Sequence, residues 1–265
     1  MYSALELGFN YLKYLISAEN GKGHGVHSPF VFDFIIHVLN NKKKYYAYQE
    51  IEALRQLIKT DGRKVSITDL GAGSRKRKGN ITTVSQIAKT SLKPKKYSQL
   101  LFRIADYYRP KTILELGTSL GLTTAYLASA NEKSKVITLE GIEGISAIAK
   151  ENFDRLQLKN VEVVEGNFDN TLPPVVERMA SIDLAFLDGN HQKLPTLNYF
   201  NLILPKTNDN SLLIFDDIHW SREMEEAWEA IKDHPQVTLT IDLFFIGLVF
   251  FRKQQKVKQH FTIRF

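Results

Sequence analysis

Cysteine is absent from this 265-residue chain, and its absence excludes several kinds of chemistry. Without cysteine there can be no disulfide, no zinc–thiolate centre and no thiol nucleophile. A chain without disulfides also fits a reducing compartment, so we expect a cytoplasmic location.

Long hydrophobic runs are missing as well. The longest run, 243-LFFIGLVFF-251, is too short to cross a bilayer as a helix. The first 17 residues have no basic start and carry Glu6 and Lys13 inside their apolar pattern, so we expect no signal peptide. With 43% hydrophobic and 24% charged residues, the composition predicts an ordinary globular protein with no membrane partner.

Acidic residues are missing between residues 70 and 105, where the chain carries nine lysines and arginines. Because the whole chain has a net charge of only +6, the basic character is local. Such a run is most often a solvated loop. The basic segment 75–96 is also suited to binding nucleic acid or another polyanion, so both interpretations stay open.

Residues 1–94 are predicted to form a helical extension with a basic loop. Leu5, Phe9 and Leu12 have the spacing of one helix face, and so do the apolar residues of 30–39. Ser28-Pro29 is typical of a helix start, with serine as the N-cap and proline as the first helical residue. A third helix is expected at about 46–59.

Strands and helices alternate from Thr112 onward. Five short apolar strands are expected at 112–116, 135–140, 161–166, 182–188 and 211–217, with helices at 121–130, 143–157, 172–180, 192–204 and 221–233. This order is typical of a parallel sheet covered by helices on both faces. Residues 237–253 then predict a closing antiparallel hairpin that turns near Ile246-Gly247. The predicted fold is a Rossmann-like, doubly wound α/β core with seven strands, followed by a tail at 254–265.

Two glycine-rich loops follow apolar runs, 67-ITDLGAGS-74 and 113-ILELGTSLG-121. A ribose-binding unit needs a carboxylate about 20 residues further on, at the end of the next strand. Glu140 meets this requirement for the second loop, and no acidic residue meets it for the first. We therefore expect the second loop to bind the cofactor. The first loop is either a structural turn at Gly71 and Gly73 or an anion-binding entrance at Arg75 to Lys78.

The spacing Glu115-x-Gly117-x-x-x-Gly121 lacks the middle glycine that lets a dinucleotide pyrophosphate approach the backbone. Together with Glu140 and the closing hairpin, this pattern resembles the class I S-adenosylmethionine-dependent methyltransferases. The resemblance implies that the cofactor S-adenosylmethionine binds along one edge of the sheet. The residues implied in binding it are Glu115, Gly117, Thr118, Ser119, Gly121, Glu140, Gly141, Asn167, Phe168 and Asp188.

Three carboxylates follow consecutive predicted strands: Asp188 after one, and Asp216 and Asp217 after the next. Because parallel strands end at the same edge of a sheet, these groups should lie close together. Carboxylates in close proximity repel one another unless a cation neutralises them. We therefore predict a divalent metal site, with Mg²⁺ the expected ion. The alternative is that the aspartates cap the next helix or form a turn in 188-DGNH-191.

This layout resembles the metal-dependent O-methyltransferases of the catechol, caffeoyl-CoA and macrolide-sugar types. Asp188, Asp216 and Asp217 match the metal-binding positions of these families. The catechol and caffeoyl-CoA types have a lysine three residues after the first aspartate, whereas this chain has His191, which resembles the macrolide-sugar type. The resemblance implies O-methylation of a small-molecule hydroxyl, with Asp188 and His191 as catalytic residues and His191 as the base.

The resemblance covers residues 95–253 and includes 97-YSQLLFRIAD-106, which is similar to the helix that enters the core in these families. Residues 1–94 match no family pattern and are expected to select the methyl acceptor. Two other functions stay open: an RNA ribose methyltransferase that uses the basic segment 75–96, and a non-catalytic module that binds adenosylmethionine. A homodimer is an open alternative to a monomer.

Overall fold

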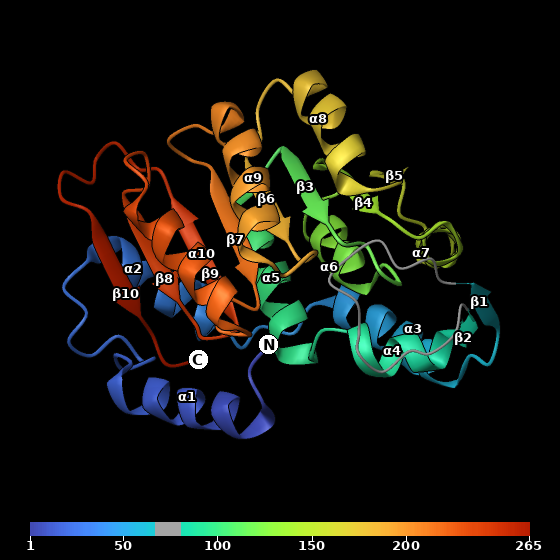
Figure 1. Ribbon diagram of the computed structural model, residues 1–265, viewed down its shortest axis with the longest axis horizontal. Helices are drawn as coiled ribbons and strands as arrows, with labels where there is room; N and C mark the ends of the chain where they lie inside the picture. The colour runs from blue at the N-terminus through green and yellow to red at the C-terminus, as the bar shows by residue number, and fades with distance from the viewer. Residues whose placement is uncertain (67–80) are drawn as a thin grey trace. The chain divides into compact units, whose positions relative to one another are not determined.

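A computed structural model describes residues 1–66 and 81–265 (Figure 1). The first glycine loop, with Gly71 and Gly73, and the basic run from Arg75 to Lys78 lie outside the described residues. The chain divides into two compact units: residues 42–175, and residues 1–41 together with 176–265.

The unit formed by residues 42–175 begins with helices and a small antiparallel pair of strands, and then alternates strand and helix. Its elements are α3 (Tyr46–Thr60), β1 (Lys64–Ser66), β2 (Ile81–Thr83), α4 (Val84–Ser91), α5 (Lys95–Tyr108), β3 (Thr112–Leu116), α6 (Leu122–Ala130), β4 (Lys135–Glu140), α7 (Glu143–Arg155), β5 (Val161–Glu165) and most of α8 (Phe168–Arg178). β3, β4 and β5 are parallel neighbours. Ile113, Leu114 and Leu116 of β3 are fully buried, as expected for a strand covered on both faces.

The other unit joins the N-terminal helices to the last part of the chain. Its elements are α1 (Ala4–Ser17), α2 (Pro29–Phe34), the π-helix η1 (Ile35–Leu39), β6 (Leu184–Leu187), α9 (Lys193–Ile203), the short η2 (Leu204–Lys206), β7 (Leu212–Asp216), α10 (Arg222–Asp233), β8 (Leu239–Asp242), β9 (Ile246–Phe250) and β10 (Gln259–Thr262). β6 and β7 are parallel, while β9 is antiparallel to both β7 and β8. Ser28 and Pro29 start α2 as predicted, and the Ser28 hydroxyl accepts the Val31 amide.

The hydrogen-bonded strand order β10-β8-β9-β7-β6-β3-β4-β5 confirms the predicted Rossmann-like, mostly parallel sheet with antiparallel strands near its end. The sheet has eight strands, one more than the sequence predicts. The additional strand, β10, pairs in parallel with β8 and comes from the segment predicted to be a tail. Its four residues 259-QHFT-262 are only partly buried, so they carry no apolar run that would have marked them as a strand.

The hairpin turn lies at residues 243–245, and the predicted turn at Ile246-Gly247 is wrong because both residues lie inside β9. The Asp242 side chain accepts the Phe244 amide at 2.7 Å, and Phe244 has a φ of 70°. Gly247 serves packing instead, since a Cβ there would lie 2.7 Å from the Trp228 ring. In the described ranges, no helix is long and apolar enough to cross a membrane.

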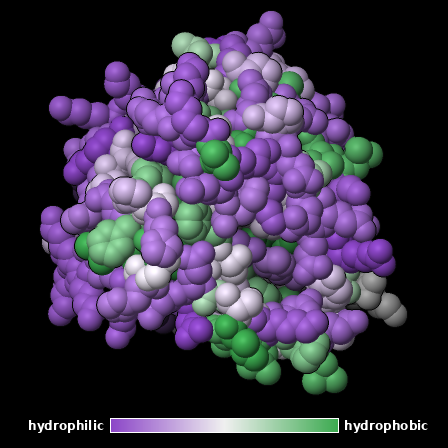
Figure 2. Space-filling model, turned by 90° about the vertical axis from the view of Figure 1, so that its left-hand side faces the viewer, coloured by the Kyte–Doolittle hydropathy of each residue, from purple (hydrophilic) through white to green (hydrophobic). Residues whose placement is uncertain are grey.

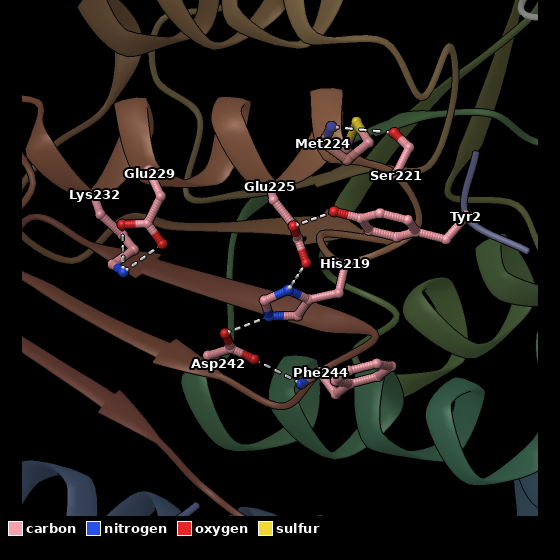
Figure 3. A network of polar contacts seen from close by, with 9 residues as sticks. All are labelled: Tyr2, His219, Ser221, Met224, Glu225, Glu229, Lys232, Asp242 and Phe244. Atoms are coloured by element: carbon pink, nitrogen blue, oxygen red, sulfur yellow. Dashed lines mark hydrogen bonds and ion pairs between the residues drawn. The ribbon is translucent and has the colours of Figure 1, made fainter. Parts of the chain in front are cut away.

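A chain of polar contacts connects residue 2 to the loop after β7, to α10 and to the end of β8 (Figure 3). The Tyr2 hydroxyl donates to Glu225 Oε2 at 2.6 Å. The His219 ring lies between two carboxylates, with Nδ1 3.2 Å from Glu225 Oε1 and Nε2 2.7 Å from Asp242 Oδ2. The same ring stacks on Phe244 at a centroid distance of 5.1 Å. The network fixes the loop that follows Asp216.

Burial lowers the pKa of His219, but hydrogen bonds to Asp242 and Glu225 and their negative charges exceed this effect, so the pKa is raised. The hydrogen bond to Glu225 and burial raise the pKa of Tyr2 to about 12.

Replacing Asp242 by alanine is expected to lower the free energy of unfolding by about 2–3 kcal/mol. The substitution leaves His219 Nε2 and the Phe244 amide without their acceptor. The control is Glu229→Ala, which removes an exposed ion pair with Lys232 at 2.8 Å and should cost less than about 1 kcal/mol. Urea unfolding of both variants measures the difference, and equal losses would contradict the assigned role of Asp242.

Candidate functional site

The glycine loop between β3 and α6 is held in place by backbone hydrogen bonds. The Gly117 and Thr118 amides both donate to the Leu139 carbonyl, at 3.0 and 3.2 Å. From the other side, the Asn152 amide group donates to the Leu120 carbonyl at 2.9 Å. The loop is therefore shaped by β4 and α7 before any ligand binds.

Gly121 ends the loop as the N-cap of α6, with a φ of 80°. A Cβ at this position would lie 2.6 Å from the Phe153 ring and 3.3 Å from the Ala149 Cβ. Both the left-handed backbone and the close packing therefore require glycine here. The close approach places the start of α6 directly against α7.

Glu140, the predicted ribose ligand, closes β4 and reaches back to the glycine loop. Its Oε2 accepts the Ser119 amide at 2.8 Å, and its Oε1 accepts the Ile142 amide at 3.1 Å. The residue is only 8% exposed. Burial raises its pKa, while backbone hydrogen bonds from Ser119, Ile142 and Gly141 oppose the shift. Two carboxylate oxygens can accept about four hydrogen bonds, so these amides leave a lone pair for a ligand hydroxyl.

Glu115 lies inside β3 and is fully buried. Its Oε2 accepts the Thr138 hydroxyl at 2.7 Å and also the Thr124 hydroxyl. The Thr118 and Thr138 hydroxyls are 2.6 Å apart. These hydrogen bonds thus connect Thr118 of the glycine loop, through Thr138, to the buried Glu115 of β3. The roles of Thr124, Thr138 and Asn152 in holding the loop were not predicted, because a buried threonine or asparagine in a strand or helix gives no signal of its partner in a single sequence.

Asn167 and Phe168, predicted at the adenine edge, form the start of α8. The Asn167 side chain accepts the Asp169 amide at 2.8 Å, which satisfies one orphan donor of the helix. The preceding Gly166 has a φ of 127° and its amide donates to the Glu140 carbonyl at 2.9 Å. The end of β5 is therefore fixed to the end of β4, where Glu140 lies.

In the other unit, a cluster of three side chains forms at the ends of β6 and β7. Asp188 directly follows β6, Asp216 is the last residue of β7, and His191 comes three residues after Asp188. Each offers one ligand atom, and the three atoms lie within 4.8 Å of one another. His191 Nε2 is 3.7 Å from Asp188 Oδ1. Asp216 is 4% exposed, whereas the side chains of Asp188 and His191 are about one quarter exposed.

Asp217 was also predicted to bind the metal, but it is not a member of this cluster. Its φ is 52°, and its amide donates to the Phe245 carbonyl at 2.7 Å. Its carbonyl accepts the Trp220 amide at 2.9 Å. The structure thus groups His191 with Asp188 and Asp216, while the ligand role of Asp217 stays a prediction.

Helix capping does not account for the aspartates after β7. Ser221 is the N-cap of α10, and its hydroxyl accepts the Met224 amide at 3.2 Å. Neither Asp216 nor Asp217 takes this position, which removes the main structural alternative for the pair. His219, which also follows β7, belongs to the network with Glu225 and Asp242.

Comparisons with known proteins bear on the same region. Residues 114–218 match the family described as a methyltransferase domain. A catechol O-methyltransferase of Niastella koreensis is 35% identical over 126 residues, which are 46% of this chain and 55% of the relative. The chain spans little more than half the length of the curated relatives it matches.

Solved structures share the fold. A putative caffeoyl-CoA O-methyltransferase from Staphylococcus aureus has a TM-score of 0.56 and 20% identity, covering 63% of this chain and 88% of that one. An O-methyltransferase from Bacillus cereus, solved in complex with SAH, has a TM-score of 0.54 and 20% identity, covering 80% and 93%. At this level of identity, the likeness concerns the fold alone.

Proposed function

We propose that this chain, which carries a class I methyltransferase domain, is an S-adenosylmethionine-dependent O-methyltransferase that acts on a small-molecule hydroxyl with a divalent metal. The observation that carries the proposal is the pairing of Glu140 with the glycine loop through the Ser119 amide. A buried carboxylate at the end of β4, bonded to a glycine loop at the end of the neighbouring strand β3, is suited to a nucleoside.

The cofactor proposal rests on the residues of the 42–175 unit. Glu140 accepts the ribose hydroxyls with its remaining lone pairs. Gly117, with a φ of 97° and no side chain, leaves room for the methionine part beside the loop backbone, while Gly121 holds the end of the loop against α7. Asn167 and Phe168, at the start of α8, border the adenine.

The metal proposal rests on Asp188 and Asp216, whose ligand atoms lie within 4.8 Å of each other and of one on His191. Two carboxylates whose oxygens are this close repel one another, and a divalent cation relieves the repulsion. Carboxylate oxygens favour Mg²⁺, Ca²⁺ and Mn²⁺, so Asp188 and Asp216 would hold the ion, with Asp217 as a further predicted ligand. A bound cation would lower the pKa of the acceptor hydroxyl.

His191 is proposed as the base. Asp188, 3.7 Å from His191 Nε2, would orient the imidazole toward the acceptor. S-adenosylmethionine, once bound, would supply the activated methyl group, and the His191 imidazole would take the proton of the acceptor hydroxyl. Precise positioning of the acceptor supplies much of the remaining rate enhancement.

The acceptor class is proposed from two features. The relative from Niastella koreensis is called a catechol O-methyltransferase, and the cluster of carboxylates suits a hydroxyl that binds near a cation. The histidine at position 191, in place of a lysine, favours an alcohol or sugar hydroxyl over a catechol. The acceptor is therefore proposed to be a small molecule with a hydroxyl group.

Replacing Glu140 by glutamine is expected to weaken S-adenosylhomocysteine binding by about 10- to 100-fold, because hydrogen bonds to a charged acceptor are worth roughly 1.5–3 kcal/mol each. In the wild type, binding should be complete where Glu140 is ionised and should fall as the pH drops through its raised pKa. The loss should begin at a higher pH than for an exposed glutamate. Calorimetric titration over a pH series measures both effects.

The control is Glu143→Gln, an exposed residue at the start of the next helix, which should leave binding and its pH profile unchanged. The acid loss of binding should disappear in the Glu140 variant. Wild-type protein that binds neither adenosylmethionine nor adenosylhomocysteine, with or without Mg²⁺, would refute the proposed function.

A further inference from the structure

Helix α1 has apolar residues on two opposite faces. One face packs within its own unit, where Tyr14 is buried against Phe244 with ring centroids 5.3 Å apart. Tyr11 meets the same Phe244 ring edge-on at 4.9 Å. These contacts account for one side of the helix and leave the other side uncovered.

The second face is a stripe of four exposed apolar side chains, which we call the α1 stripe. Leu5, Phe9, Leu12 and Ile16 are 88%, 58%, 53% and 76% exposed. Figure 2 shows hydrophobic side chains gathered at the lower edge of the molecule, where Figure 1 places α1. Their spacing of four, three and four residues is that of a coiled-coil seam. A contiguous exposed apolar stripe of this kind marks an interaction site.

We propose that the α1 stripe is the contact between two copies of this chain, with the two α1 helices packed antiparallel about a two-fold axis. In such a pair, Leu5 faces Ile16 of the second copy and Phe9 faces its Leu12. Both pairs belong to the same register of the two helices, so all four side chains of each stripe are paired at the same time. A two-fold interface requires this kind of self-complementarity.

The charges beside the stripe support the same arrangement. Glu6 and Lys13 are the only charged residues of α1, and at seven residues apart they lie two turns apart on the same flank. In the antiparallel pair, Glu6 of each copy lies beside Lys13 of the other. Lys13 already leans over the stripe, with its Nζ 4.5 Å from the Phe9 ring centroid. In a parallel pair, this flank would instead face the opposite flank of the second helix, so Glu6 and Lys13 would have no opposite charge beside them.

The charge of α1 also favours a second copy of the chain over a membrane as the partner of the α1 stripe. One glutamate and one lysine give the helix no net charge, whereas a helix that lies on an anionic membrane is usually rich in lysine and arginine.

Gly8 lies on the other flank, and no atom is within 4 Å of a Cβ added there. The second helix can approach closely at this point. A single helix pair buries less than the roughly 1,600 Å² of a standard interface, so the dimer should be reversible.

The test is sedimentation velocity of the full chain over a range of concentrations. The wild type should change from monomer to dimer, and Leu12→Gln should weaken the dimer by at least about tenfold, since the substitution occurs twice at a two-fold interface. The matched control is Leu57→Gln on α3, which is equally exposed at 53% and should leave association unchanged. A wild type that stays monomeric, or a dimer that Leu12→Gln does not weaken, would overturn the proposal.

A charge exchange gives a second test that does not depend on the stability of one variant. Glu6→Lys and Lys13→Glu should each weaken self-association, because like charges then face each other across the interface. An equimolar mixture of the two variants should dimerise again, because each lysine then meets a glutamate. Self-association that neither substitution changes, or a mixture that stays monomeric, would refute the antiparallel arrangement. Vesicle binding by monomers that requires Leu12 would assign the stripe to lipid instead.

Discussion

Replacing Asp216 by asparagine is expected to reduce the rate of methyl transfer by about 10²- to 10³-fold, equivalent to roughly 3–4 kcal/mol of lost transition-state stabilisation. The substitution keeps the shape of a side chain that is 4% exposed and removes its charge. Without that charge, the cluster with Asp188 and His191 holds a cation less tightly. Steady-state assays over a Mg²⁺ series, with catechol and simple alcohols as acceptors, measure the loss.

Adenosylhomocysteine binding should stay unchanged in this variant, because no proposed cofactor contact involves Asp216. The control is Asp209→Asn, which removes an exposed carboxylate paired with Lys253 at 3.0 Å and should keep full activity. If Asp216→Asn retained full activity and an unaltered response to Mg²⁺, the metal part of the proposal would be wrong, while the cofactor part would stand.

Replacing Gly121 by alanine is expected to destabilise the protein by about 2–5 kcal/mol. The left-handed backbone costs an L-residue roughly 1–2 kcal/mol, and overpacking against Phe153 costs about 1–3 kcal/mol more. Because the strained residue belongs to the glycine loop, adenosylhomocysteine binding should weaken in the same variant. Thermal unfolding, with and without the ligand, measures both effects.

The two causes can be separated by a second substitution. Phe153→Leu in the Gly121→Ala background should recover the packing part of the loss and leave the backbone part. The control is Gly62→Ala in the same unit, where no atom lies within 4 Å of an added Cβ, and there the stability should change little. A Gly121→Ala variant as stable as the wild type would show that the loop does not need glycine at this position.

The features that the sequence predicted correctly depend on short-range patterns. Continuous apolar runs such as 112-TILEL-116 predict buried strands, because a strand covered on both faces needs apolar residues at every position. Ser28-Pro29 gave the start of a helix through local capping chemistry. Glu140 was singled out by its place at the end of a strand about 20 residues after a glycine loop; it is bonded to that loop, while its contact with a ribose stays a prediction.

The features that the sequence did not predict depend on partners that are distant in the chain. β10 exists because β8 offers an edge for pairing, and no pattern within 259-QHFT-262 indicates that edge. The turn was placed at Gly247 because glycine is typical of turns, whereas that glycine accommodates Trp228. Asp217 was predicted as a ligand only because it follows the end of a strand. Its left-handed backbone and the hydrogen bond from its amide to Phe245 involve a residue distant in the chain, which its position after a strand does not indicate.

The chain has two tryptophans, and their surroundings differ. Trp228 is 2% exposed and packs against Gly247, so its emission should be blue-shifted and insensitive to ligands. Trp220 is partly exposed and bonded through its backbone to Asp217 and Tyr2, four residues after Asp216. With Trp228 replaced by phenylalanine, fluorescence would come from Trp220 alone. The loop beside the aspartate cluster thus carries its own optical probe, which can test in solution, without a label, whether a cation binds there.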